Sequence, residues 1–315
     1  MYIREIIQKV KSVLEERRST AERIGAEREL EIRARSSEFA KIDDELRKTG
    51  PLIFKTAVSG GDITPIRERN ELLLRRRAEI LRGLGYPADY TDAPYTCKKC
   101  SDTGYSDGYV CSCYKELMIT ENIKGSGIGR LIEKQSFENF DLDWYGTDTP
   151  ERERMESNLA EAIAFAKRFD GSSGENLLLV GNTGTGKTHI STAIAKAVIE
   201  RGYSVLYDST QNIISEFEND RFRSGYGAYE PKADKYLTAD LLILDDLGAE
   251  FSNQFTVSCL YNLLNTRQNK GLSTIISTNL HPTELSSKYE DRIFSRLVGS
   301  DTKMLLFVGR DHRIG

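Results

Sequence analysis

The first part of the chain carries apolar residues at helical spacing. They recur three or four positions apart, at Ile3, Ile6, Val10 and Val13. A thinner stripe continues the pattern, so a long charged helix is predicted over residues 1–48, ended by Gly50 and Pro51. A second helix is predicted from Thr64-Pro65 to about Arg82, because these two residues supply an N-cap and a first helical position. The two helices are expected to form a hairpin, which is either a solvated, charge-laced structure or an arm that docks a partner.

From Pro150 onward, short apolar runs alternate with helical stretches. The runs are ENLLLVG, SVLYD, LLILDD, STIISTN and KMLLFVG. Such alternation is typical of a parallel sheet buried on both faces. We therefore predict an α/β fold, a parallel sheet sandwiched by helices, over residues 135–315. Before it we expect an N-terminal helical arm, residues 1–90, and a cysteine module with a linker helix, residues 91–134.

Composition excludes several classes of protein. Apolar residues make up 39% and charged residues 29% of the 315 residues, as in soluble globular proteins. The formal net charge is −4, so any nucleic-acid binding must come from a local basic patch. No apolar run approaches the ~20 residues that span a bilayer, and the charged N-terminus does not resemble a signal peptide. A cytoplasmic protein without a membrane partner is expected.

One motif predicts a phosphate-binding loop. The pattern G-x-x-x-x-G-K-[ST] is matched throughout by Gly181, Asn182, Thr183, Gly184, Thr185, Gly186, Lys187 and Thr188. A predicted strand precedes it and a helical pattern follows it, as this motif requires. Its glycines let backbone N–H groups turn toward phosphate oxygens, and the helix N-terminus favours negative charge. Lys187 is expected on the β- and γ-phosphates of ATP, and the Thr188 hydroxyl on Mg²⁺.

Two acidic residues and an amide follow other predicted strands. Asp245 and Asp246 end the run LLILDD, and Asn279 ends STIISTN. Ligands bind at the carboxyl ends of strands in such sheets. Asp245 is expected to be the Mg²⁺ partner and Asp246 to polarise the attacking water, while Asn279 is expected to hold that water or sense the γ-phosphate.

Arginines follow these motifs in the chain. Arg292 and Arg296 lie four residues apart, on one face of a predicted helix, and Arg313 lies near the end of the sequence. Arg221 and Arg223 are candidates for contact with DNA phosphates, although a solvated helix end is the favoured explanation.

The run GNTGTGKTH, LLILDDLG, IISTN, DRIFSRL and GRDHR resembles the AAA+ ATPases of the DnaC/DnaI/IstB branch, over about residues 135–315. The resemblance implies a P-loop ATPase that binds ATP or ADP and assembles through its ATPase interfaces. It makes Asn279 the first sensor, Arg296 the arginine finger in preference to Arg292, and Arg313 the second sensor. Many AAA+ proteins carry Asp-Glu where this chain has Asp245-Asp246, so weak hydrolysis that a partner or DNA stimulates is expected.

The remaining cluster consists of cysteines. Cys97, Cys100, Cys111 and Cys113 form two close pairs within seventeen residues. In a reducing compartment such pairs are more often metal ligands than disulfides. Four thiolates with no open position predict a structural Zn²⁺ site, and a redox pair is the alternative.

The cysteines favour one function within this branch. DnaI-type helicase loaders resemble the chain in having a zinc module before the ATPase, a module associated with gripping the replicative helicase. The resemblance thus implies a primosomal loader in DNA replication that binds a hexameric DnaB-type helicase and places it on single-stranded DNA. An IstB-like ATPase that assists a transposase is the alternative. An adaptor in which ATP binding only orders an interaction surface is a third possibility.

Overall fold

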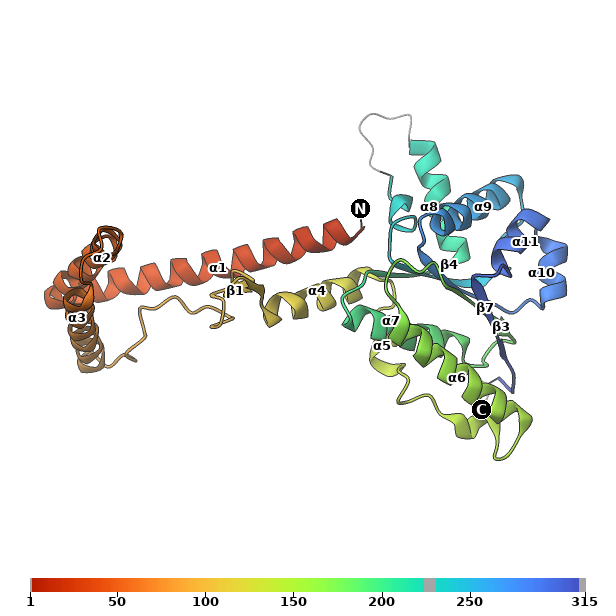
Figure 1. Ribbon diagram of the computed structural model, residues 1–315, viewed down its shortest axis with the longest axis horizontal. Helices are drawn as coiled ribbons and strands as arrows, with labels where there is room; N and C mark the ends of the chain where they lie inside the picture. Colours follow the sequence, from red (N-terminus) through yellow and green to blue (C-terminus); the bar gives the residue numbers. More distant parts are fainter. Residues whose placement is uncertain (1, 224–230, 312–315) are drawn as a thin grey trace. The chain divides into compact units, whose positions relative to one another are not determined.

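The computed structural model describes residues 2–223 and 231–311. The chain divides into two compact units, one formed by residues 11–114 and the other by residues 1–10 and 115–315. Figure 1 gives the course of the chain through the elements of each unit. The larger unit contains the predicted α/β fold, and the smaller one contains the helical hairpin and the cysteines.

A parallel sheet forms the centre of the larger unit. In the described part of the chain its strand order is β4 (Val205–Ser209), β5 (Leu241–Leu247), β6 (Ser273–Thr278), β3 (Asn176–Gly181) and β7 (Thr302–Phe307). All neighbouring pairs are parallel. The predicted strands are therefore confirmed, and the sheet places the ends of β3, β5 and β6 next to one another, because β6 lies between the other two.

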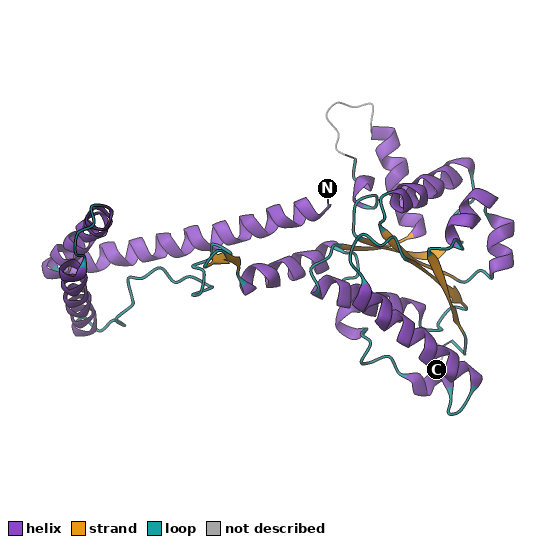
Figure 2. Ribbon diagram, viewed as in Figure 1, coloured by secondary structure: helices purple, strands orange, loops and turns teal. Residues whose placement is uncertain are grey.

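Helices cover both faces of this sheet, as Figure 2 shows. They are α6 (Pro150–Arg168), α7 (Lys187–Glu200), α8 (Thr210–Arg223), α9 (Gln254–Asn269), α10 (Pro282–Lys288) and α11 (Asp291–Leu297). Short helices α5 (Leu131–Lys134), η1 (Leu142–Tyr145) and η2 (Ala233–Lys235) lie in the connections. One face buries Leu177, Ile243 and Ile275 against α6 and α7 in a single hydrophobic core, which fixes the strand that leads into the phosphate-binding motif.

The outer edge of β4 is covered by the end of α4 (Ser112–Gly125) and the residues after it. The Asn122 side chain donates to Tyr203 O at 2.6 Å and accepts from Val205 N at 3.3 Å. Tyr207 N donates to Ser126 O at 2.6 Å. Gly127 has a φ of +81° and approaches so closely that an added Cβ would lie 2.2 Å from Tyr207 O. This segment therefore binds β4 as a further strand would.

The smaller unit contains most of α1 (Tyr2–Arg35), together with α2 (Ser37–Val58) and α3 (Thr64–Gly83). The prediction of one helix to residue 48 is wrong, because the backbone of Ser36 is extended and its side chain caps α2 by accepting from Phe39 N. Pro51 does not end α2 but lies inside it, although a proline removes one hydrogen bond of the helix. The predicted second helix is confirmed as α3. It forms a hairpin with α2 and not, as was predicted, with a single helix over residues 1–48.

Candidate nucleotide site and cysteine cluster

The phosphate-binding motif forms the turn between β3 and α7. Gly186, the N-cap of α7, has a φ of +91°, which favours glycine, and an added Cβ there would lie 2.8 Å from the Tyr145 hydroxyl. Lys187 is buried and its Nζ donates to the carbonyls of Gly181 at 2.7 Å and Asn182 at 2.8 Å. The lysine thus lies folded onto its own loop, next to the backbone N–H groups at the start of α7.

A cavity of about 420 Å³ opens over this loop. Its wall contains the motif residues Thr183, Gly184, Gly186, Lys187 and Thr188, and also Asp246 and Asn279. Residues more than ninety positions apart in sequence are brought together here because β3, β5 and β6 end at one edge of the sheet. A cavity of this size suits a nucleotide.

Asp245 lies behind this cavity wall and is buried. One carboxylate oxygen accepts from the Tyr207 hydroxyl on β4, and the other accepts from the Ser277 hydroxyl on β6. Tyr207 also contacts the side chain of Thr188. Burial, followed by the negative charge of Asp245, raises the pKa of Tyr207, so its hydroxyl keeps its proton and donates. Asp245 and Thr188 offer the hard oxygen atoms that Mg²⁺ prefers, so the residues present fit this ion.

Asp246 points differently from Asp245 because β5 is irregular at this place. The register of β5 against β6 shifts between Leu244 and Leu247, and Asp246 has a φ of +54°. Its amide donates to Ser277 Oγ at 3.1 Å, and its side chain is exposed at the cavity. A bulge of this kind re-aims a side chain next to a site. The two neighbouring carboxylates therefore have different surroundings. Asp245 is buried and hydrogen-bonded, whereas Asp246 is open to the cavity.

One wall of the cavity is aromatic, and none of the sequence motifs predicts it. Phe140 stacks with Tyr145 at 6.0 Å and meets the edge of His189 at 5.1 Å. The Tyr145 hydroxyl donates to Thr185 O at 3.1 Å, and His189 Nε2 donates to Ser136 O at 2.9 Å. Burial lowers the pKa of His189, which keeps the ring neutral. The many aromatic residues in the run FENFDLDWY could have indicated this wall. No sequence pattern indicates the contacts that Tyr207 and Ser277 make with Asp245.

The predicted arginines have different environments. Arg296 is half-buried, and its guanidinium lies 4.5 Å from the centre of the Tyr261 ring, while Nη2 donates to Asn265 Oδ1 at 2.7 Å. Arg292 also lies over the Tyr261 ring, at 5.0 Å, but it is exposed and pairs with Glu290 at 2.7 Å. Arg221 lies over the Phe255 ring at 5.4 Å. Arg223, the last residue of α8, is exposed, and Arg313 lies outside the described residues.

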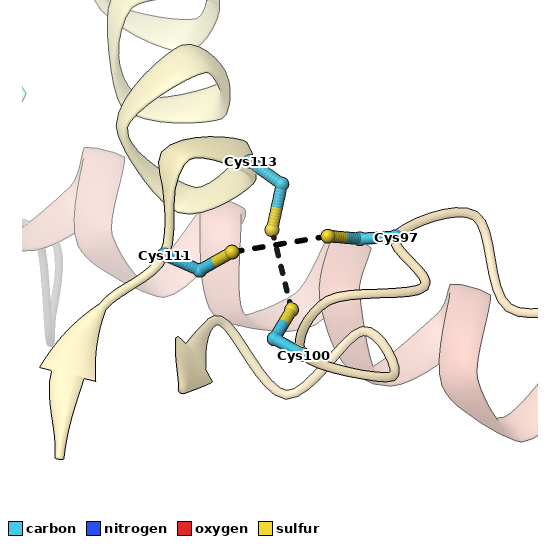
Figure 3. Close-up of side chains that lie close together, drawn as sticks. All are labelled: Cys97, Cys100, Cys111 and Cys113. Carbon is cyan, nitrogen blue, oxygen red and sulfur yellow. Dashed lines mark hydrogen bonds between the residues drawn. The ribbon is translucent and has the colours of Figure 1, made fainter. Parts of the chain in front are cut away.

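The cysteine cluster closes around one point, as Figure 3 shows. The sulfur atoms of Cys97, Cys100, Cys111 and Cys113 all lie within 4.8 Å of one another. The Cys97–Cys111 and Cys100–Cys113 pairs are 3.8 Å and 3.4 Å apart. Four sulfurs about 2.3 Å from a central Zn²⁺ have similar mutual distances in a tetrahedron. All four thiols are free, so the donor set fits a structural zinc ion.

The backbone around the thiols is arranged by Asp102. This buried carboxylate accepts from Thr96 N at 2.8 Å and Cys97 N at 2.9 Å. The strands β1 (Tyr105–Ser106) and β2 (Tyr109–Val110) then return the chain to the second cysteine pair through a turn with positive φ at Asp107 and Gly108. Hydrogen bonding from the Cys113 amide lowers the pKa of Cys111 to about 7, whereas burial raises that of Cys113.

Comparisons with known proteins identify the family of the chain. The family model described as IstB-like ATP binding protein matches residues 126–298, more than half of the chain. The chain belongs to this family. As an IstB-family protein it is an AAA+ ATP-binding protein of the DnaC/DnaI/IstB branch, and the fold and family implied by the sequence are confirmed.

The relatives of this IstB-family chain include a helicase loader and an insertion sequence protein. The replicative helicase loader DnaC of Escherichia coli (strain K12) is 26% identical over 182 residues, which are 58% of this chain and 70% of the relative. A putative insertion sequence ATP-binding protein of Sinorhizobium fredii is 35% identical over 108 residues, covering 34% of this chain and 35% of the relative. The solved structure of DnaI covers 60% of this chain and 95% of its own, with 22% identity and a TM-score of 0.48.

In the part of this IstB-family chain that the structure describes, no helix has the length and apolar character needed to cross a membrane.

Proposed function

We propose that the chain is an ATP-dependent helicase loader that binds a DnaB-type replicative helicase and helps to place it on single-stranded DNA in the cytoplasm. The observation that carries this proposal is the presence in one chain of an AAA+ nucleotide site and a separate four-thiol cluster. The similarity to a protein named a replicative helicase loader, over 182 residues, supports the same function.

The nucleotide chemistry follows from the residues around the cavity. Lys187 exchanges its contacts with Gly181 and Asn182 for phosphate oxygens when ATP enters. Asp245 and Thr188 hold Mg²⁺, which neutralises charge on the phosphates when bound. Asp246 and Asn279, both exposed at the cavity, orient the attacking water. The shorter carboxylate of Asp246 makes hydrolysis slow, so ATP acts mainly as a switch that hydrolysis resets.

Self-assembly completes this site. Arg296 lies on α11, away from the cavity of its own subunit, whose lining does not include it. In an oligomer built through ATPase interfaces its guanidinium reaches the γ-phosphate of a neighbouring subunit and stabilises the charge that develops there. Arg313 acts as the second sensor.

The smaller unit is the helicase-binding part in this proposal. Zn²⁺ bound by the four cysteines maintains its fold. Several large apolar side chains on α2 and α3 are exposed, among them Phe54 (72%), Val58 (74%) and Leu72 (61%). Exposed apolar groups of this size are common at protein interfaces. The larger unit contacts single-stranded DNA through the α8 end, where Arg223 is exposed.

A reconstitution tests this function. The chain is mixed with a DnaB-type helicase, ATP and single-stranded DNA coated with its binding protein, and helicase loading is followed by unwinding of a labelled duplex. We expect loading by the wild type and none by Lys187→Ala, which cannot hold ATP. Failure of the wild type to co-purify with or load the helicase contradicts the proposal.

The IstB-like alternative has its own support. The insertion sequence relative is 35% identical, although over a shorter segment. An ATPase that assists a transposase stimulates strand transfer in a transposition assay and does not bind a helicase. A stimulated strand transfer without helicase loading would therefore favour this second function.

A further inference from the structure

The hydroxyl of Tyr207 occupies a position that none of the nucleotide motifs explains. Tyr207 belongs to β4, whose Ser209 is paired in register with Asp245 of β5. Its hydroxyl donates to one oxygen of Asp245 and contacts Thr188. From the opposite side Ser277 donates to the other oxygen. The two residues expected to hold Mg²⁺ thus share one tyrosine hydroxyl between them.

Tyr207 is fixed from several directions. Its backbone N–H donates to Ser126 O at 2.6 Å, and Gly127 approaches its carbonyl without room for a side chain. Its ring packs against the large hydrophobic core of the sheet. Because both backbone and ring are held, the hydroxyl has little freedom to follow a moving carboxylate. The carboxylate must adopt the orientation that the hydroxyl allows.

A carboxylate held in this way retains the capacity to bind. Each carboxylate oxygen has two acceptor positions, so Asp245 can accept from Tyr207 and Ser277 and still contact Mg²⁺ or a water bound to it. Mg²⁺ demands nearly ideal octahedral geometry, and outer-shell partners that orient its ligands contribute to metal affinity.

We propose that Tyr207 is a positioning residue for the Mg²⁺–nucleotide site, which holds Asp245 from the neighbouring strand in the orientation that Mg²⁺ requires. Ser277 supports the same carboxylate from β6. The inference rests on the proposed ATP and Mg²⁺ chemistry, and it does not depend on whether the partner is a helicase or a transposase.

The test is Tyr207→Phe, which removes the hydroxyl and keeps the ring. Binding of a fluorescent ATP analogue is titrated with Mg²⁺ and repeated in EDTA. Loss of an outer-shell partner typically lowers metal affinity by about 10–100-fold. We therefore expect that the Mg²⁺ concentration which produces half of the change in nucleotide binding rises at least about tenfold. The affinity in EDTA is expected to stay unchanged, because Tyr207 does not line the cavity.

Tyr236→Phe is the matched control. Tyr236 is a buried tyrosine whose hydroxyl, like that of the partly buried Tyr207, donates to a carboxylate, here Asp208 Oδ2 at 2.7 Å, outside the cavity. We expect its Mg²⁺ titration to match the wild type. If Tyr207→Phe does not fold, as judged by its thermal transition, Ser277→Ala is used and must show the same selective weakening.

The outcomes separate the inference from the proposed function. Wild-type protein that binds no nucleotide, or binds it without any effect of Mg²⁺, overturns the proposed function. A wild type that responds to Mg²⁺ and a folded Tyr207→Phe with the same titration overturn the positioning role alone. Equal weakening in Tyr236→Phe also overturns it, because the effect is then not specific to Asp245.

Discussion

Arg296 is held by side chains of α9 in its own subunit. Its guanidinium stacks on Tyr261, donates to Asn265 Oδ1 at 2.7 Å and donates to Arg292 O at 2.6 Å. Planar stacking and directed hydrogen bonds suit the guanidinium better than they would suit a lysine. The side chain is therefore ordered within its own subunit, and in the proposed oligomer this order would lower the entropy cost of presenting it to a phosphate.

Arg296→Ala should bind ATP almost as the wild type does but lose the part of its hydrolysis that rises with protein concentration. Removal of an arginine finger costs on the order of 10³-fold or more in well-studied cases. ATP turnover is measured over a range of protein concentrations. Mixing with Lys187→Ala, which keeps its own Arg296, should restore some activity across mixed interfaces.

Arg292→Ala is the matched variant for this experiment, because Arg292 is exposed on the same helix and pairs with Glu290. It should retain concentration-dependent hydrolysis. If Arg292→Ala loses it and Arg296→Ala does not, the finger is Arg292. If mixing never restores activity, the arginine does not act on a neighbouring subunit.

Arg267 is buried completely, with an exposed fraction of 0%. Its guanidinium donates to Tyr236 O, Ala239 O, Ser273 O and Thr274 Oγ1, at distances from 2.6 to 3.0 Å. Burial lowers its pKa to about 9. The side chain thereby satisfies several acceptors in the connection between η2 and β5 and at the start of β6.

Arg267→Ala should destabilise the larger unit by about 3–5 kcal/mol, because it leaves a cavity and orphaned buried carbonyls. Urea unfolding measures the change. Lys270→Ala is the control, since Lys270 donates to Leu237 O of the same connection from an exposed position. Exposed substitutions usually change stability by less than about 0.5 kcal/mol. Similar losses in both variants would contradict the role given to Arg267.

At the scale of elements, the sequence predicted the strands well and the first helices less well. The strands β3 and β5 contain the unbroken apolar runs LLLV and LLIL, because a central parallel strand is buried on both faces. The break at Ser36 depends on one capping side chain within a charged stretch, and α2 continues through Pro51 in a hairpin with α3, which lies elsewhere in the chain. The local pattern of apolar and polar residues indicates neither the capped break at Ser36 nor the continuation of the helix through Pro51.

In the candidate nucleotide site, too, some features could be predicted from the sequence and others could not. The meeting of Lys187, Asp246 and Asn279 at one cavity could be predicted, because each lies at or beyond the carboxyl end of a strand in a parallel sheet. Tyr207 and Ser277 were not, because their contact with Asp245 depends on strand order and register. Strand order is a property of the whole sheet and cannot be inferred from the spacing of residues in a motif.

The cysteine element gives another prediction. Asp102→Ala should lower Zn²⁺ affinity by about 10–100-fold, because the carboxylate that orders the backbone at Cys97 is lost. Competition with a chromogenic chelator measures the affinity. Asp92→Ala is the control, because Asp92 is exposed and pairs with Arg77 at 3.3 Å. Protein purified under reducing conditions that contains no zinc would contradict the assignment of the metal.

At the scale of the molecule, the cysteines and the phosphate-binding loop belong to different compact units. Removing zinc with a chelator should therefore leave the affinity for ATP within about twofold of its starting value while helicase binding is lost. Fluorescent nucleotide titration and co-purification of the same sample measure the two effects. Helicase binding that survives chelation would exclude the zinc module as the docking part.

The cover that Asn122 and Ser126 provide over β4 also bears on solubility. A strand with a free edge offers unpaired N–H and C=O groups to any other chain, and such edges promote aggregation. A fragment of residues 128–315 keeps the whole sheet but leaves the groups of Tyr203, Val205 and Tyr207 unpaired. It should precipitate or form sheet-to-sheet assemblies, whereas residues 115–315 should remain dispersed, as light scattering would measure. The residues from Asn122 to Gly127 thus protect the sheet from association with other copies of the chain.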